Sequence, residues 1–546
     1  MDSRARELRK QGDALFSGRA RLIAFWQAVA LNFYPQRADF LATSDDPFMS
    51  DHLYSSYPVL ARRELGNLFA AMLRPRTARW YSGHVDDKKL DEGSAERAWL
   101  EWMTEVMWRA MYDPAANFAR ATKEADHDYV TFGNAIIQPQ LDRVNQHLLY
   151  RSHHLRDCAW SENASGKIDV IHRNWKPSAR QLVELFPGKT SKEVTEAAKK
   201  EPERTFECRH IVVPARMYQM DTSAGRRFPF VSLYIECESE TVLEEIPTRR
   251  FGYVIPRWAT VSGSQYARSL ATEVALPDAR TLQVVIRTLR EAAEKHVDPP
   301  KIAAAEALRS DVFLQAGGIT YYDSEYVQYG DKILMPVDSN PGTMPVGHEI
   351  ALALREDIRN AWFLDKINLP QANLDKMTAF AVRRLLEEQV RAQAPLFEPI
   401  EPEYSAPLCN ETFELLRDGG AFGPPESIPE TLRATDVNFT FQSPLRDIAD
   451  ATKTQKFVEG LQLTAQAAQF DPSAAAALKI PKALTDALRG IGIDQDWLGT
   501  EEEVNAARQQ LAERQKMEAG AGALATGADI AGKAAKAATE LQGAGL

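Results

Sequence analysis

The chain has 546 residues, 44% of them hydrophobic and 26% charged, with a formal net charge of −11 at pH 7. This composition excludes wholesale disorder, and the length predicts roughly three or four packing units. The acidic balance excludes a protein that holds DNA or an anionic membrane surface through net positive charge.

The cysteines and the N-terminal residues indicate the compartment. The four cysteines lie far apart and form no CxxC pair, which predicts free thiols in a reducing cytosol and no disulfide or zinc framework; they are Cys158, Cys208, Cys237 and Cys409. The first residues contain no apolar signal segment, and no run approaches the ~18 apolar residues of a membrane span. We expect a soluble protein made inside the cell.

Residues 1–135 predict mainly helices. Three segments, 22–35, 58–75 and 95–114, carry apolar side chains at helical spacing, and a proline closes each of them. The spacing predicts that their apolar stripes form core rather than a platform for stacking bases. The stripe residues are Leu22, Phe25, Trp26, Val29, Leu60, Leu65, Leu68, Phe69, Met72, Trp99, Met103, Val106 and Met111.

Residues 136–258 change to a strand pattern. Residues 157–175 alternate in polarity on both sides of a glycine-containing turn, which predicts two strands. Residues 205–215 and 229–246 are rich in β-branched side chains and predict further strands. A short helix is predicted at 178–186. The first half of the chain is therefore predicted to be α+β.

Two long helices follow. The first is predicted at 277–298, with Pro277 and Asp278 in its first turn and Pro299 as its stop. About 20 residues at 1.5 Å each make a rod of roughly 30 Å. The second is predicted at 347–367, and the residues between them suggest a small β-rich insert. Two rods that carry an insert at one end are an unusual plan for an enzyme.

The remaining segments are less regular. A helix is predicted from Met377 to prolines near 395–407, a second one ends at the glycine pair of residues 413–420, and residues 436–445 read as a strand and a turn. Thr500 and Glu503 form a capping box. The Ala/Gly-rich residues from Ala519 onward fit either a thin helical extension or a disordered tail.

Motifs of known enzyme classes are missing from the sequence. It contains no phosphate-binding loop, dinucleotide fingerprint, HExxH or GxSxG motif. The triplet Asp126-His127-Asp128 suggests a metal or acid–base site, but residues about 100° apart on a helix cannot converge on one ion. We therefore expect a solvated helix face that ends at Gly133, where the chain turns into a strand. His153, His154 and Cys158 form a weak metal candidate, because adjacent histidines on a strand point to opposite faces.

Several segments together resemble the portal, or head-to-tail connector, proteins of short-tailed bacteriophages. The resemblance runs nearly from end to end and rests on the order and spacing of its pieces rather than on one motif. Pro399, Pro402 and Ala267 depart from the family pattern. The segments are RPRTARWYSG, AWLEWMTEVMWRAMYDPAANFARATKEADHDYVTFGNAII, IDVIHRNWKPSARQLVELFP, IPRWATVSGSQYARSLATEVALPDARTLQ, DKMTAFAVRRLLEEQ, FTFQSPLRD and ALRGIGIDQDWLGTEEEVNAARQ.

The resemblance implies a helix-rich α+β portal fold with wing, stem, clip and crown, and with a C-terminal helical barrel as an option. It assigns the chain as follows: 1–276 wing, 277–298 first stem helix, 299–346 clip, 347–367 second stem helix, 368–376 tunnel loop, 377–499 wing and crown helices with a strand, and 500–546 crown or barrel helix and tail.

The implied function is a structural conduit. A dodecamer at one capsid vertex would pass double-stranded DNA during packaging and ejection, with no cofactor, no metal and no membrane. Implied partners are the terminase motor, tail adaptors, capsid and scaffolding proteins, and internal core or ejection proteins; the protein would assemble in the bacterial cytoplasm and remain in the virion. The tunnel loop comprises Asn368, Leu369, Pro370, Gln371, Ala372, Asn373, Leu374, Asp375 and Lys376, and candidate transient DNA contacts are Arg355, Arg359 and Lys366.

Other classes predict different features. A tail adaptor is usually much shorter than this chain. A metal-dependent phage nuclease or protease needs a convergent acidic cluster, which no spacing here supports. A packaging motor needs the phosphate-binding loop that the sequence lacks.

Overall fold

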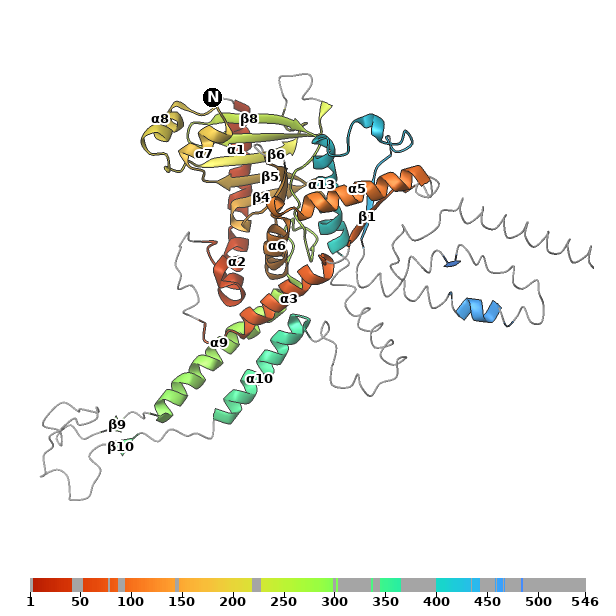
Figure 1. Cartoon of the computed structure of the whole chain (residues 1–546). Coiled ribbons are helices and arrows are strands. Elements are labelled where there is room, and N and C mark those ends of the chain that lie inside the picture. Colours follow the sequence, from red (N-terminus) through yellow and green to blue (C-terminus); the bar gives the residue numbers. More distant parts are fainter. Residues whose placement is uncertain are drawn as a thin grey trace, which may run out of the picture. The chain divides into compact units, whose positions relative to one another are not determined.

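In a computed structural model the chain divides into two compact units, Met1–Asp91 with Glu96–Gln442, and Glu92–Ala95 with Ser443–Leu546. The described residues are 3–41, 53–76, 79–86, 94–142, 147–218, 227–297, 301–302, 335–336, 344–364, 399–433, 435–441, 457, 459–464, 466 and 483–484. Residues 459–464 of the second unit are helical. The helices and strands named below belong to the first unit, apart from the first two residues of α5 (Ser94–Tyr112). The mixture of helices and antiparallel strands in the first unit confirms an α+β, helix-rich fold (Figure 1).

The predicted N-terminal helices are confirmed. They are α2 (Ala20–Phe33), α3 (Tyr57–Leu73) and α5 (Ser94–Tyr112), and α1 (Ser3–Gly18) precedes them. Their apolar stripes contribute core residues, with Val29, Leu65 and Met103 fully buried. Phe25 and Leu60 are exposed, contrary to the prediction, because they lie at the edges of their stripes. Short 3-10 turns follow at η1 (Pro35–Arg37), η2 (Pro114–Ala116), η3 (Leu155–Asp157) and η9 (Pro425–Ser427).

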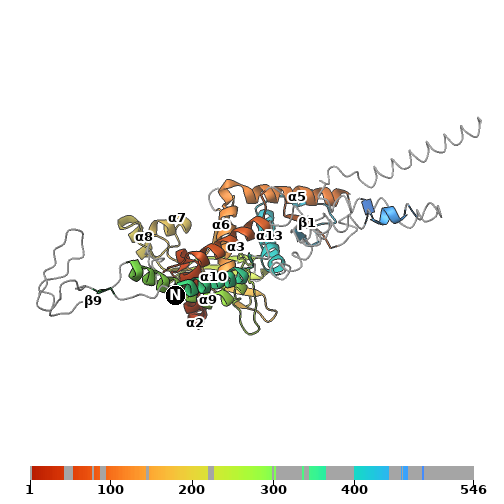
Figure 2. The ribbon, with the colours of Figure 1, turned by 90° about the horizontal axis from the view of Figure 1, so that it is seen from below.

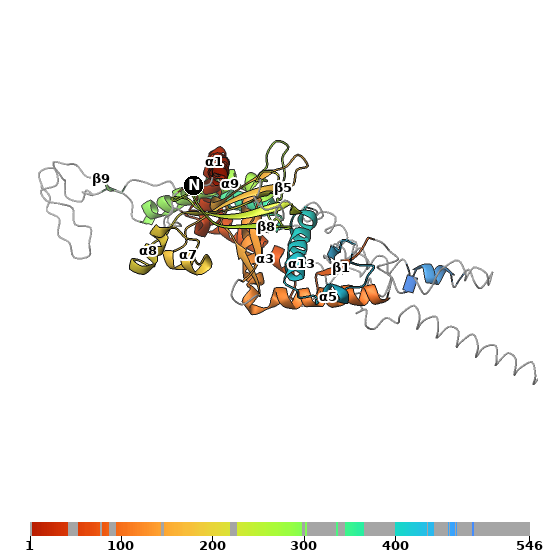
Figure 3. The same cartoon turned by 90° about the horizontal axis from the view of Figure 1, so that it is seen from above.

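A five-stranded antiparallel sheet forms from strands that are consecutive in the chain. Its order is β4 (Cys158–Glu162), β5 (Ile168–Trp175), β6 (Cys208–Pro214), β7 (Phe230–Glu236) and β8 (Thr241–Thr248). Strand alternation sends Ile211 and Val213 to the face that α1 covers. Cys208 packs on the other face, against α7 (Ala179–Leu185) and α8 (Lys192–Lys200). Figure 3 shows α1 on one side of this sheet and α7 and α8 on the other. The predicted strands and the predicted helix at 178–186 are confirmed.

Helix α6 (Phe118–Phe132) lies at the centre of the first unit and contacts α2, α3 and α9. Two smaller antiparallel pairs complete this region. They are β2 (Ile137–Leu141) with β3 (Leu148–Ser152), and β1 (Tyr81–His84) with β11 (Asn438–Phe441). The second pair places Tyr81 beside Phe441 and joins segments that are far apart in the sequence, since its paired residues Ser82 and Thr440 are 358 positions apart.

The two predicted rods are present with different ends. Helix α9 spans Leu270–Val297 and α10 spans Met344–Ala361. The first rod starts earlier than predicted because the Ser269 hydroxyl accepts a hydrogen bond from the Thr272 N–H at 3.2 Å and caps the helix there. Pro277 and Asp278 are therefore inside α9 and not in its first turn. The rods lie side by side in Figures 1 and 2.

A short strand pair marks the far end of the rods. β9 (Lys301–Ile302) follows α9 and pairs antiparallel with β10 (Met335–Pro336), which precedes α10. This pairing agrees with a β-containing insert between the rods. The rest of the predicted insert lies outside the described residues.

The prolines after residue 398 are accommodated differently from the prediction. A π-helical segment, η8 (Glu401–Ser405), runs directly into α13 (Ala406–Asp418), so Pro402 and Pro407 lie inside helical structure. Pro402 lies in the first turn of η8, and Pro407 lies in the first turn of α13. The helix predicted from Met377, the Thr500 capping box and the tail after Ala519 lie outside the described residues.

The four cysteines are free and buried. Among the residues that the structure covers, no helix combines the length and apolar character needed to cross a membrane.

Candidate functional site

The triplet Asp126-His127-Asp128 lies in the interior, and the prediction of a solvated helix face is wrong. The three side chains are 0%, 8% and 1% exposed. The reason is that α6 packs against α2, α3, α9 and β3, and Tyr404 also contacts it. All residues of α6 from Ala125 onward are therefore buried. Buried carboxylates require specific partners, and each of these two has one.

Asp126 is paired with Arg74, which lies just after α3. Arg74 Nη2 donates a hydrogen bond to Asp126 Oδ1, and the Tyr404 hydroxyl donates a second one to the same oxygen at 2.8 Å. The Arg74 guanidinium also lies 4.7 Å from the centre of the Tyr404 ring. Burial raises the pKa of Asp126 above its ordinary value, while the positive charge of Arg74 opposes that shift. This cluster joins α3, α6 and η8.

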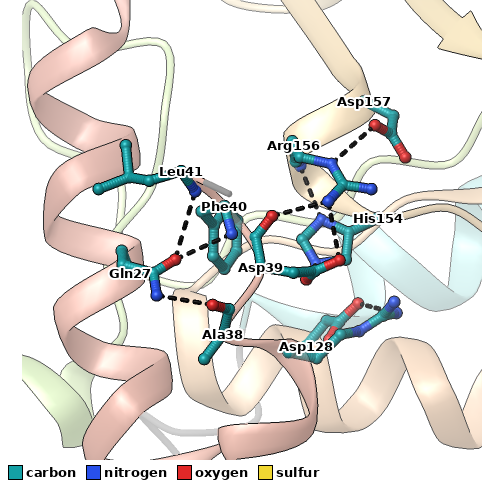
Figure 4. Close-up of polar contacts among 10 residues, drawn as sticks. Gln27, Ala38, Asp39, Phe40, Leu41, Asp128, His154, Arg156 and Asp157 are labelled. Atoms are coloured by element: carbon teal, nitrogen blue, oxygen red, sulfur yellow. Dashed lines mark hydrogen bonds and ion pairs between the residues drawn. The ribbon is translucent and has the colours of Figure 1, made fainter. Parts of the chain in front are cut away.

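Asp128 is paired with Arg37 in a bidentate arrangement. Arg37 Nε and Nη2 donate to the two carboxylate oxygens at 3.1 and 2.7 Å, and the negative charge of Asp128 raises the pKa of Arg37. A second ionic group lies nearby (Figure 4). There Asp39 lies 2.8 Å from His154 Nε2 and accepts a hydrogen bond from Arg156 Nη1 at 2.8 Å. These pairs connect η1, α6 and η3.

His127 packs against Gly66 of α3. A Cβ atom at Gly66 would lie 2.1 Å from His127 Nδ1, so only glycine lets the histidine ring approach the helix this closely. The ring also lies edge-on to Tyr34, with centroids 6.2 Å apart. Burial, together with the nearby positive charge of Arg62, lowers the pKa of His127 to about 4. The imidazole is therefore neutral at physiological pH.

We expect His127 to make the protein sensitive to acid. The folded-state pKa of about 4 lies below the ordinary value of about 6.5, so the stability that the neutral ring provides is complete above pH 6.5. It is lost as the pH falls toward 4. The His127→Gln variant should therefore lose less thermal stability than wild type between pH 7 and 5, measured by melting temperature. The control is His348→Gln, a substitution at an exposed histidine, which should leave the pH dependence of the melting temperature as in wild type. An unchanged pH dependence in His127→Gln would contradict this assignment.

These ionic groups form separate pairs that hold helices and turns of the first unit together. Asp126, Asp128 and Asp39 each face a specific cation, and they occupy separate positions instead of converging on one point. In the described ranges, no group of three or more His, Cys, Asp or Glu side chains could hold a metal ion. His153 Nε2 forms a hydrogen bond with Gln138 at 2.9 Å, and burial raises the pKa of the Cys158 thiol to about 12. The structure therefore does not bring His153, His154 and Cys158 together as a metal site.

The base of the rods is fixed by Gln283 of α9. Its Oε1 accepts hydrogen bonds from the N–H groups of Tyr54 and Ser55, both at 2.8 Å, and its Nε2 donates to the Ser55 carbonyl at 2.9 Å. The side-chain amide of Gln283 therefore holds the backbone of residues 54–55 through these three hydrogen bonds. We call this arrangement the Gln283 clamp. Beyond Gln283, no side chain of α9 is fully buried, so this is where the rod leaves the body.

The C-terminal end of α10 is anchored in the core. Ile358 and Trp362 are fully buried, and the Trp362 ring lies 5.2 Å from Phe33. Arg355 and Arg359 are half-buried, and the Arg355 guanidinium lies 5.9 Å from the centre of the Tyr57 ring. Lys366 and the segment 368–376 lie outside the described residues. The described chain before the predicted tunnel loop thus ends at Leu364, which is itself buried.

A family model for bacteriophage head to tail connecting proteins matches residues 5–498. The chain belongs to this family. It is 26% identical over 487 residues to a probable portal protein of Bordetella phage BPP-1, an alignment that covers 87% of this chain and 85% of the relative. It is also 25% identical to the portal protein of Salmonella phage epsilon15, over 69% of this chain and 67% of the relative. The predicted function, a phage portal or head-to-tail connector, is confirmed.

Family membership gives the buried pairs and the clamped rods a structural meaning. A phage head-to-tail connecting protein is a component of the virion, and in this chain the buried ion pairs and the Gln283 hydrogen bonds hold its helices and turns together. The residues that the sequence did not identify are Arg37, Arg74, Tyr404 and Gln283. Arg74 lies within RPRTARWYSG, a segment that marked the family resemblance, but nothing in its local pattern identifies Asp126 as its partner.

Proposed function

We propose that this head-to-tail connecting protein forms a dodecameric ring at one capsid vertex, and that double-stranded DNA passes through its central channel during packaging and ejection. The clamped pair of long helices carries this proposal. An α9 helix of 28 residues and an α10 helix of 18 residues project from a braced α+β body. Side-by-side repetition of such rods around an axis makes a tubular wall.

The proposed division of the chain follows the described elements. The sheet with its helices would form the wing, α9 and α10 the stem, and the β9–β10 pair part of the clip. Residues 368–376 would form the tunnel loop, which narrows the channel directly after the anchored end of α10. Crown and barrel would follow in the C-terminal part.

The charge of the chain suits a channel that does not retain DNA. Strong phosphate contacts would hinder sliding, because every neutralised phosphate adds to affinity. With a net charge of −11 for each chain, the ring would repel DNA over most of its surface. Arg355, Arg359 and Lys366 would supply transient phosphate contacts near the anchored end of α10.

The proposed partners follow from this position. The clip would meet the terminase motor and later the tail adaptors, and the wing would meet capsid and scaffolding proteins. Internal core or ejection proteins would contact the crown. We propose a conduit with no catalysis of its own, assembled in the host cytoplasm.

Electron microscopy of the purified protein tests the ring directly. Negatively stained particles should show rings with a central hole, and native mass should give about twelve or thirteen copies, the range expected of a cyclic assembly with this function. A stable monomer at high concentration would contradict the proposal.

Shortening the segment 368–376 tests the channel separately. Because the segment follows an anchored helix and would face the DNA, its loss should impair packaging or retention of DNA while rings still form. Packaged DNA is measured as nuclease-resistant genome in assembled heads. Normal packaging by intact rings would contradict the assignment of this segment to the tunnel.

A further inference from the structure

The outer faces of α9 and α10, which point away from each other, carry opposite charges. On α9, Arg280, Val284 and Arg287 are exposed at spacings of four and three residues, and Val284 is 63% exposed. On α10, Glu349 and Glu356 are exposed two turns apart. In the part of the chain that the structure covers, Arg280, Glu349 and Glu356 have no ion-pair partner.

Several other charged side chains of the two rods already have partners within the chain. Glu291 of α9 accepts a hydrogen bond from Arg287 Nε at 2.8 Å, and Glu273 accepts one from Arg268 at 2.6 Å. Arg355 of α10 is half-buried, with its guanidinium 5.9 Å from the centre of the Tyr57 ring. Between residues 280 and 287 the outer face of α9 is therefore basic, and that of α10 is acidic at Glu349 and Glu356. Exposed Glu294 lies on the same face of α9, but beyond this segment and two turns past Arg287.

The contact between the rods fixes their register. A Cβ at Gly347 would lie 2.7 Å from a Leu289 methyl group. Burial, and to a smaller extent the negative charge of nearby Asp357, raises the pKa of Asp278. The helices are thus antiparallel, with residue 278 level with 357 and 289 level with 347. In this register Arg280 is level with Glu356, and Arg287 is level with Glu349.

Cyclic symmetry keeps this register between neighbouring copies. A rotation about the ring axis does not change the height of a residue along that axis. Where rods stand side by side along the axis, α9 of one copy meets α10 of the next at the same heights as within one copy. Arg280 then faces Glu356, Arg287 faces Glu349, and Val284 lies between them, opposite Leu352.

We propose that the basic outer face of α9 docks on the acidic outer face of α10 of a second copy of this chain, and that this charge match sets the order and height of subunits in the ring. The inference rests on the proposed ring and names the surface that builds it. Contacts between two α9 faces would oppose arginine to arginine, so the same charges disfavour a wrongly oriented pair.

Charge reversal tests the pairing. Arg280→Glu and Glu356→Arg should each raise the protein concentration needed for ring assembly at low salt by about tenfold, which corresponds to about 1.4 kcal/mol, because each places like charges opposite one another. The double variant Arg280→Glu/Glu356→Arg should restore assembly. Arg290→Glu on a different face of α9 is the matched control. Ring formation is measured by mass photometry and negative stain.

Engineered cysteines provide a second readout. Under mild oxidation, Val284→Cys/Leu352→Cys should form disulfides between chains and give a ladder of linked subunits, whereas either single variant should give none. The native cysteines do not interfere because all four are buried. Normal rings from both single charge reversals, or no interchain ladder from the cysteine pair, would overturn this interface and leave the ring intact. Failure of the wild-type chain to form rings would instead overturn the proposed function.

Discussion

Replacing Arg74 with methionine is expected to lower the free energy of unfolding by about 3–5 kcal/mol, the cost of leaving one member of a buried ion pair without its partner. The Arg74 side chain is 4% exposed and that of Asp126 is 0% exposed, so solvent cannot take over the lost interaction. Among the described residues, the Tyr404 hydroxyl would remain as the hydrogen-bond donor to the Asp126 carboxylate. Urea or thermal unfolding of the purified chain measures the loss.

The pH dependence gives an independent check on the cause. Without Arg74, the pKa of Asp126 should rise further, because burial already raises it and the opposing charge is gone. A raised folded-state pKa means that the contribution to stability is present at low pH and is lost as the pH rises. The penalty of Arg74→Met should therefore be smaller at pH 5 than at pH 8.

Two comparisons separate the charge effect from lost packing. Arg79→Met removes an exposed pair with Glu105 and should cost less than about 1 kcal/mol. Adding Asp126→Leu to Arg74→Met should recover much of the loss, since a buried ion pair can often be replaced by apolar side chains. Equal losses in Arg74→Met and Arg79→Met, or no recovery in the double variant, would show that the buried charge is not the cause.

The same cluster shows what a sequence pattern can predict. Helix α6 and its end at Gly133 follow from apolar residues at steps of three or four and from one glycine, which are local signals. The partners of its carboxylates are not local: Arg74 is 52 residues from Asp126, and Arg37 is 91 residues from Asp128. A charged residue reads as solvated until the helices around it are known, and for that reason the burial of the triplet was not predicted.

The rods show a similar division. Apolar periodicity predicts both helices and their order, but their ends depend on caps and tertiary contacts. Ser269 caps α9 and also donates to the Val130 carbonyl at 2.6 Å, so the start of the rod is set by its contact with α6. The Gln283 clamp is likewise formed with residues 54–55, more than 200 positions earlier in the chain.

Gly133→Ala, which adds one methyl group, is expected to lower the stability of the protein strongly, because Gly133 lies at the contact between α6 and the start of α9. Gly133 ends α6 with φ of +75°, a conformation that costs an L-residue about 1–2 kcal/mol. A Cβ there would also lie 2.2 Å from the backbone carbon of Arg268 and 2.5 Å from the backbone nitrogen of Ser269. The backbone cannot rotate away as a side chain can, so α6 and the start of α9 must separate.

Gly166→Ala isolates the clash from the backbone strain. Gly166 has nearly the same φ, +77°, but an added Cβ there meets nothing within 4 Å. We expect Gly166→Ala to cost about 1 kcal/mol and Gly133→Ala to cost more than about 3 kcal/mol, since the cost of a steric clash adds to that of the strain. The difference is measured by chemical unfolding. Separation of α6 from α9 should also weaken the Ser269 cap and shift the rod base, so Gly133→Ala should reduce ring assembly while Gly166→Ala should not. Equal stability losses in the two variants would show that the close approach of Arg268 and Ser269 does not hold the base of the rod.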